Sequence, residues 1–135
     1  MTLEFSDAVI ANRLKAMTDA IDSASTAGYL NIYDGTRPSA KGDAVTTQVK
    51  LAAIRFAKPS AGPVSGTTLT LQMGSPVLAL KTGVASWARI TNGDGVFVAD
   101  LDIGPEESGA DVEMRDAQLY EGGEVSAAVA SLVEA

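Results

Sequence analysis

The sequence predicts a mainly β fold: an antiparallel β-sandwich, immunoglobulin-like or jelly-roll-like, with one N-terminal α-helix. Short runs of alternating apolar and polar residues recur along the chain, and clusters of Gly, Pro, Asn and Asp separate them every ~8–12 residues. Clear helical periodicity is confined to the start of the chain. We therefore expect an amphipathic helix and its cap over residues 1–28, followed by a single β-sandwich domain of about 7–9 short strands over residues 29–135.

The helix is predicted over residues 6–24. Ser6 suits the N-cap, Asp7 suits the positive end of the helix dipole, and Gly28 is available as the C-terminal cap. Four apolar positions spaced four, three and four residues apart make one stripe: Ile10, Leu14, Met17 and Ile21. The stripe has two interpretations. It packs on the sheet of its own domain, or it self-associates or docks on a partner.

The chain between the helix and residue 80 predicts strands separated by loops. Residues 36–44 have a loop-like composition, whereas residues 45–56 predict a long strand. The alternation of that strand shifts by one residue at 52–54, as a β-bulge or bend would produce. Pro, Gly and Ser mark residues 58–66 as a loop. Two further segments, 29–34 and 67–73, alternate as strands, and 77–80 predicts a short apolar strand.

Residues 83–103 predict a β-hairpin, the best-defined local structure in the sequence. Its turn holds an Asn-Gly and an Asp-Gly dipeptide, which supply the positive φ angles that hairpin turns require. The first strand carries the only Trp, Trp87, and Arg89 on the same face is placed to lie against the indole ring. The second strand is expected to have two faces: Phe97, Ala99, Leu101 and Ile103 on one, and Val98, Asp100 and Asp102 on the other.

The remaining residues predict an acidic loop and two or more strands. The loop spans 104–109, and strand-like alternation follows at 111–115 and again at 119–120. After a Gly122-Gly123 turn, residues 125–133 are rich in Ala and could form a helix. We favour a strand because Val recurs there at even spacing.

Composition excludes several functional classes. The net charge of −7 argues against a role on nucleic acid or on anionic lipid. The chain has no Cys and no His, which excludes Cys-His and Ser-His-Asp catalysis and the usual zinc sites. A Ser-Lys or paired-carboxylate enzyme stays formally open. No apolar run approaches the ~20 residues of a membrane span, and the start lacks a signal-peptide pattern, so we expect a cytoplasmic site of synthesis.

Three patterns have a functional and a structural interpretation. Four acidic residues of the hairpin region could bind a divalent cation, although no EF-hand loop is present and a solvated acidic face is favoured: Asp94, Asp100, Asp102 and Asp111. The Gly-rich turn at 92–96 leads into a strand and not a helix, which favours a hairpin over a phosphate loop. The scattered aromatic residues could stack on a sugar, but core or interface positions are favoured. We expect no enzymatic activity, no cofactor and no metal.

Several motifs, taken in order, resemble small virion structural proteins of tailed bacteriophages. The motifs are Asn-Arg-Leu-Lys-Ala at 12–16, Leu-Asn-Ile-Tyr-Asp-Gly at 30–35, Thr-Gly-Val-Ala-Ser-Trp-Ala-Arg-Ile at 82–90, Gly-Ala-Asp-Val at 109–112, and the Gly122-Gly123 turn with its Val-rich final strand. The resemblance implies a β-rich protein that binds other copies of itself and a capsid or tail lattice. It implies no catalytic residues.

The leading hypothesis is therefore a head decoration (minor capsid) protein that reinforces the shell as a homo-oligomer, such as a trimer, bound to the major capsid protein. It would reside in the virion, and in the host cytoplasm during assembly. A tail, neck or baseplate component is an alternative, and a carbohydrate-binding module of a phage fibre is another. The residues expected to make the contacts are the helix stripe and one loop: Ile10, Leu14, Met17, Ile21, Arg37 and Pro38.

Overall fold

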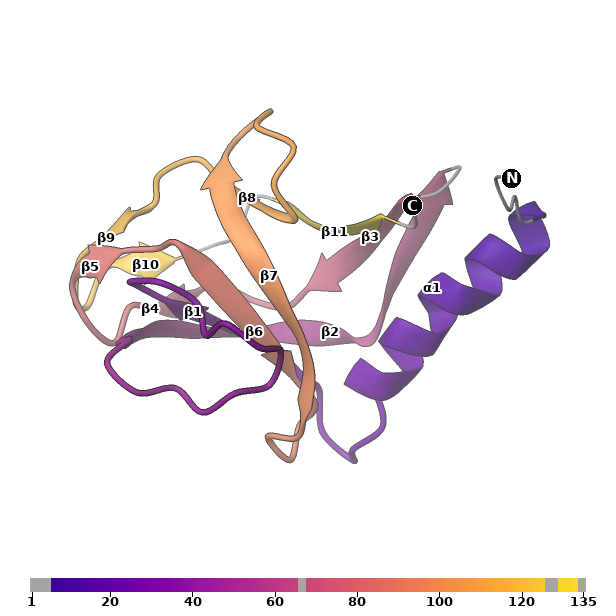
Figure 1. Cartoon of the computed structure of the whole chain (residues 1–135), viewed down its shortest axis with the longest axis horizontal. Helices are drawn as coiled ribbons and strands as arrows, with labels where there is room; N and C mark the ends of the chain where they lie inside the picture. The colour runs from indigo at the N-terminus through magenta and orange to yellow at the C-terminus, as the bar shows by residue number, and fades with distance from the viewer. Residues whose placement is uncertain (1–5, 66–67, 126–128, 134–135) are drawn as a thin grey trace.

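The computed structural model describes residues 6–65, 68–125 and 129–133, and it is mainly β with one N-terminal helix, as predicted (Figure 1). The helix precedes all the strands. In chain order the elements are α1 (Asp7–Ile21), β1 (Tyr29–Tyr33), β2 (Lys50–Ser65), β3 (Thr68–Met73), β4 (Val77–Leu78), β5 (Gly83–Val84), β6 (Trp87–Thr91), β7 (Phe97–Pro105), β8 (Val112–Met114), β9 (Gln118–Leu119), β10 (Glu124–Val125) and β11 (Val129–Val133).

Seven strands form one curled sheet that closes on itself in the order β1-β2-β3-β11-β8-β7-β6. Opposite walls of this sheet pack across a common core, as the two layers of a sandwich do. The prediction of a wholly antiparallel sheet is wrong at one place, because β7 and β8 run parallel. The turn after β7 and the short crossing to β8 bring the chain back alongside β7 in the same direction.

The four two-residue strands form a separate feature at one end of the molecule. β4 pairs with β10, and β5 pairs with β9. Both pairs are antiparallel and belong to one alignment of residues 77–85 with residues 117–125. Backbone hydrogen bonds extend each ladder by one residue, from Ala79 N to Gly123 O at 2.8 Å beside the β4–β10 pair and from Ala85 N to Ala117 O at 2.8 Å beside the β5–β9 pair. We call residues 77–85 and 117–125 the end ribbon. These short strands bring the number in the described residues to eleven, above the predicted range.

The helix forms where it was predicted and packs on the barrel. The Ser6 hydroxyl accepts a hydrogen bond from Val9 N at 3.2 Å, which confirms the N-cap. The C-cap is Asp22 and not Gly28. Gly28 instead lies against a neighbouring strand, where an added Cβ would come within 2.6 Å of Thr91 O. The helix contacts β2 and lies at the end of the long axis opposite the end ribbon (Figure 1).

The second strand differs most from its prediction. β2 begins at Lys50, five residues late, and continues through the segment predicted as a loop. Its pairing with β3 loses register between Phe56 and Ala61 and again between Ala61 and Val64. Interruptions of this kind tolerate proline, which cannot donate to a regular ladder. The structure confirms the predicted bulge, but places it at Leu51, one residue before the predicted 52–54. A register shift there leaves Leu51 without a partner on β1.

The hairpin is confirmed, with one exchange of faces. The Asn92 side-chain oxygen accepts hydrogen bonds from the amides of Asp94 and Val96, and Gly95 has a φ of 85°. A register shift next to Thr91 places Phe97 on the outer face and lets Val98 pack on the core, the reverse of the prediction. After the turn at 122–123 the described residues form strands, as predicted, whereas residues 126–128 lie outside the described part.

Candidate functional site

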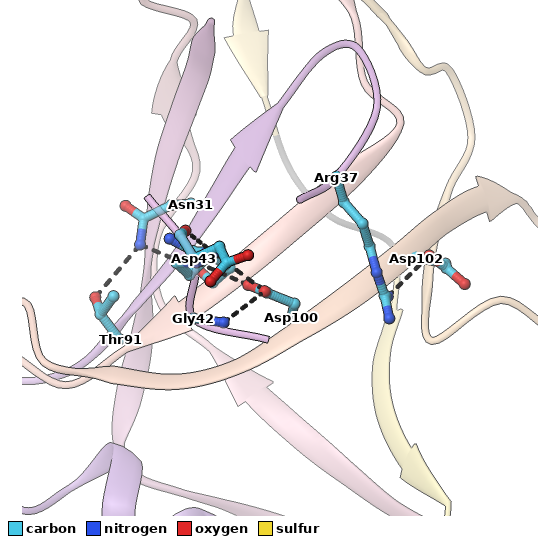
Figure 2. Close-up of polar contacts among 8 residues, drawn as sticks. Asn31, Arg37, Gly42, Asp43, Thr91, Asp100 and Asp102 are labelled. Atoms are coloured by element: carbon cyan, nitrogen blue, oxygen red, sulfur yellow. Dashed lines mark hydrogen bonds and ion pairs between the residues drawn. The ribbon is translucent and has the colours of Figure 1, made fainter. Parts of the chain in front are cut away.

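The loop at residues 34–49, which we call the strap, lies over the outer face of the hairpin (Figure 2). Several bonds fasten its two ends. Trp87 Nε1 donates to Asp34 O at 3.0 Å, Ser86 Oγ donates to Gly35 O at 2.5 Å, and Val49 N donates to the Asp34 carboxylate at 2.6 Å. A loop of this length without regular structure is uncommon in a compact domain, and here side-chain bonds take the place of a ladder.

A buried ion pair fixes the middle of the strap. Arg89 Nε and Nη2 donate to the two Asp100 oxygens at 2.7 and 3.1 Å, and the side chains are only 11% and 3% exposed. Arg89 Nη2 also donates to Asp43 O, and Gly42 N donates to Asp100, so both charges hold the strap (Figure 2). The hydrogen bonds that Arg89 donates to Asp100 raise the pKa of Arg89 above its usual value. This pair therefore joins two strands and the strap.

The aromatic residues beside this pair are buried. The Tyr33 and Trp87 rings stack with centroids 4.6 Å apart, and the Arg89 guanidinium lies 5.4 Å from the Trp87 ring, which confirms that predicted contact. Burial raises the pKa of Tyr33. Asn31 on the same face donates to Arg89 O and to Thr91 Oγ1 (Figure 2). The indole is not available as a sugar-stacking platform, because it is almost fully covered.

Three of the four acidic side chains of the hairpin region, those of Asp100, Asp102 and Asp111, have partners within the chain, and Asp94 is exposed at the turn. Asp102 binds Arg37 of the strap at 3.0 Å and stays 69% exposed, whereas Asp100 is buried, so the predicted solvated acidic face is wrong for Asp100. Asp111 accepts a hydrogen bond from Asp102 N. Within the described residues, no group of three or more acidic side chains is placed to hold a metal ion. The charged groups of this face therefore bind neighbouring segments of the chain to one another.

The helix stripe packs on the chain's own barrel, which is the first of its two interpretations, and the assembly contacts expected of it stay a prediction. Leu14 and Ile21 lie in the core, and Ile10 and Met17 pack partly against it. Leu14 and Ile21 are therefore not open to a partner, whereas Ile10 and Met17 are half-buried. Arg37 is exposed and Pro38 half-buried, and both lie on the strap, where the structure brings Arg37 to β7 and not to the helix.

The candidate interaction site is the outer face of the end ribbon. Strand alternation sends Val77 and Val125 inward and Leu78 outward, opposite Glu124. Four of the eight exposed large apolar side chains in the described residues lie on this ribbon: Leu78 (62% exposed), Leu80 (51%), Val84 (56%) and Tyr120 (65%). Exposed apolar side chains gathered on one part of a monomer are typical of an interaction surface.

Sequence reasoning missed this site. The segment at 77–80 was predicted as a short apolar strand, with no sign that alternate residues face water. Its outward face exists because residues 117–125 pair beside it, and that pairing has no local signal.

No family model, curated protein or solved structure matches the chain. No helix in the described part of the chain is long and apolar enough to cross a membrane.

Proposed function

We propose that the chain is a structural protein of a bacteriophage virion, in the first place a head decoration (minor capsid) protein that binds copies of itself and the capsid lattice. The observation that carries the self-association is the apolar face of the end ribbon. Leu78, Leu80 and Tyr120 are each more than half exposed. A standard interface buries ~800 Å² per partner, so this face supplies the apolar centre of one.

The sequence motifs at 12–16, 30–35 and 82–90 support the virion context. The same face would equally serve a tail, neck or baseplate component. The carbohydrate-binding alternative has less support, because Trp87 and Tyr33 are buried and the Arg55 guanidinium lies 4.6 Å from the Tyr29 ring. Its acidic residues are also engaged, as Asp100 is with Arg89.

Self-association is tested by sedimentation of the wild type, Leu78→Lys and a matched control, Val96→Lys. Val96 is 59% exposed, close to the 62% of Leu78, but lies at the hairpin turn outside the ribbon. We expect the wild type and Val96→Lys to form oligomers. Leu78→Lys should be monomeric, because a lysine ammonium would have to lose its water in an apolar contact. Circular dichroism should show all three folded.

A wild type that stays monomeric at its highest soluble concentration would overturn the proposal. The virion context has its own test, which is mass spectrometry of particles purified from a host that makes the chain. Presence in the particle in a fixed ratio to the major capsid protein supports a decoration role. Absence removes the virion part of the proposal and leaves self-association standing.

A further inference from the structure

An open hollow of about 620 Å³ lies on the outer face of the sheet, over β1 and its neighbours β2 and β6. Leu30 and Ile32 of β1 are in the core, so strand alternation turns Asn31 and the two tyrosines of β1 outward. Asn31 lies between these tyrosines and opposite Ala53 of β2, and the two short side chains leave the sheet surface low at this point. The volume falls within the ~300–1,000 Å³ of small-molecule sites.

Asn31 carries an acceptor that its own chain does not use. The residue is only 5% exposed, and its Nδ2 donates to Arg89 O at 3.0 Å and to Thr91 Oγ1 at 3.3 Å, both on β6 (Figure 2). The amide oxygen Oδ1 points away from these two partners, and no donor of the described residues bonds to it. In that part of the chain, Ser60 Oγ is the one fully enclosed side-chain polar atom without a partner, so Asn31 Oδ1 is open to the hollow. A nearly buried acceptor in this position favours a ligand that brings a donor.

Lys50 supplies a positive charge at the same hollow. It is exposed on β2, and its ammonium lies 6.0 Å from the centre of the Tyr33 ring. No ion pair joins it to a carboxylate of the described residues, whereas Arg89, the other cation that lines the hollow, is bound to Asp100. On a chain with a net charge of −7, the Lys50 charge is therefore available to an anion from outside.

Two further side chains of the hollow favour a ligand with hydroxyl groups. Thr91 accepts the bond from Asn31, so its own hydroxyl hydrogen is left to donate to a ligand. Asp94 lines the hollow from the hairpin turn and is exposed, so its carboxylate can accept bonds from hydroxyls. The same carboxylate disfavours a second negative charge on the ligand.

Neither tyrosine of the hollow offers a free ring face. Tyr33 is 8% exposed and stacks on Trp87, and the Arg55 guanidinium lies 4.6 Å from the centre of the Tyr29 ring. A ligand is therefore recognised here through its charge and its hydrogen bonds, and not by stacking. For this reason a neutral sugar is not the ligand that the hollow favours.

We propose that this hollow binds a small anion that also carries hydroxyl groups, such as a sugar acid or a sugar phosphate. Lys50 binds the anionic group, one ligand hydroxyl donates to Asn31 Oδ1, and Thr91 donates to a ligand oxygen. An ammonium acts as a point charge and binds a carboxylate or a phosphate, so the shared feature is a negative charge beside hydroxyls. The hollow shares no residue with the end ribbon, so this inference does not rest on the proposed self-association.

The test compares four probes, titrated into the isotope-labelled full chain and followed by NMR at the side-chain amide of Asn31. Gluconate has the charge and the hydroxyls, hexanoate has the charge alone, and sorbitol has the hydroxyls alone. Glucose 6-phosphate replaces the carboxylate by a phosphate. We expect gluconate or glucose 6-phosphate to shift the Asn31 amide resonances and to bind at least about tenfold more tightly than hexanoate and sorbitol, which is ~1.4 kcal/mol. The tighter of the two identifies the anionic group.

Variants test the residues that make the site. Lys50→Met removes the charge and should weaken binding at least about tenfold. Lys41→Met is the matched control, because Lys41 is exposed on the strap and does not line the hollow, and it should bind as the wild type does. Ala53→Phe fills the hollow with a residue that strands favour, and it should abolish binding. Circular dichroism should show all three variants folded.

Several results would overturn this site. Hexanoate that binds as tightly as gluconate would show that the Asn31 acceptor is not used, and sorbitol that binds as tightly would show that the Lys50 charge is not. Binding that Lys50→Met and Lys41→Met change equally would place the anion elsewhere. So would probes that leave the Asn31 amide unmoved at their highest soluble concentration. None of these results concerns the end ribbon, so the proposed function would stand, and a monomeric wild type would leave this site untouched.

Discussion

At the scale of single residues, Asp100 and Asp102 show how burial changes what an aspartate–arginine ion pair contributes to stability. They lie two residues apart on β7, face the same side and each binds an arginine. Asp100 is 3% exposed and accepts bonds from Arg89 and Gly42, whereas Asp102 is 69% exposed and binds only one guanidinium nitrogen, that of Arg37. Removing one partner of a buried pair leaves the other charge without compensation, whereas an exposed partner returns to water.

We predict that Asp100→Asn lowers the free energy of unfolding by about 3–5 kcal/mol. Asp102→Asn, the same substitution at the exposed position, should lower it by less than about 1 kcal/mol. Urea denaturation followed by the fluorescence of Trp87, which lies beside the pair, measures both values. Equal losses for the two variants would show that burial of the Asp100 pair does not set its contribution.

Only part of this residue-level arrangement could be predicted. Arg89 and Trp87 are two apart on one strand, so their contact follows from strand alternation alone. The contact with Asp100 needs the cross-strand register, in which Arg89 lies opposite Asp100. The contacts that Asp43 and Arg37 make come from the strap, whose path has no regular pattern from which to predict it.

At the scale of elements, α1 is positioned by both local and tertiary signals. Ser6 begins the helix through a bond to its own first turn, and the spacing of Leu14 and Ile21 decides which face is buried. Thr18 on the same face is also buried and satisfies its hydroxyl by donating to Lys15 O at 2.9 Å. The helix is thus part of the barrel's core and not a separate docking arm.

We predict that Leu14→Ala lowers the free energy of unfolding by about 2–5 kcal/mol, because it removes core contacts and leaves a cavity. Val9→Ala, at a 41% exposed position of the same helix, should change it by less than about 0.5 kcal/mol. Thermal and urea denaturation give both numbers. If Leu14→Ala abolished oligomers without loss of stability, the stripe would be an interface after all.

The elements predicted best are those whose ends and buried face are indicated by residues of the element itself. The helix has a cap and a stripe, and the hairpin turn has an Asn-Gly and an Asp-Gly dipeptide. β2 was predicted wrongly because Pro59 and Gly62 signal a loop unless the partner strand is known. The register shifts opposite β3 accommodate these residues, and nothing near them in the sequence indicates that β3 lies alongside.

At the scale of the whole molecule, the closure of the barrel and the end ribbon depend on pairing between distant segments. β11 lies between β3 and β8, and β1 lies between β2 and β6. The ribbon joins residues 77–85 to 117–125. Because no local pattern encodes these neighbours, the sequence indicated strands but not which faces they leave exposed. The predicted contact residues were therefore placed on the helix and on the loop at Arg37 and Pro38, and the exposed apolar residues of the end ribbon were not among them.

Whole-molecule charge leads to the last prediction, which concerns salt. Each copy carries a net charge of −7, so copies repel at low ionic strength, while the proposed contact is apolar at its centre. Raising the salt from about 0.1 to 1 M shortens the Debye length from about 10 to 3 Å and screens that repulsion. We therefore expect the dissociation constant for self-association to fall severalfold, as sedimentation in a sodium chloride series would measure. Val96→Lys, with one less net negative charge, should show a smaller change. Dissociation by salt would mean that ion pairs hold the copies together, and not the apolar ribbon.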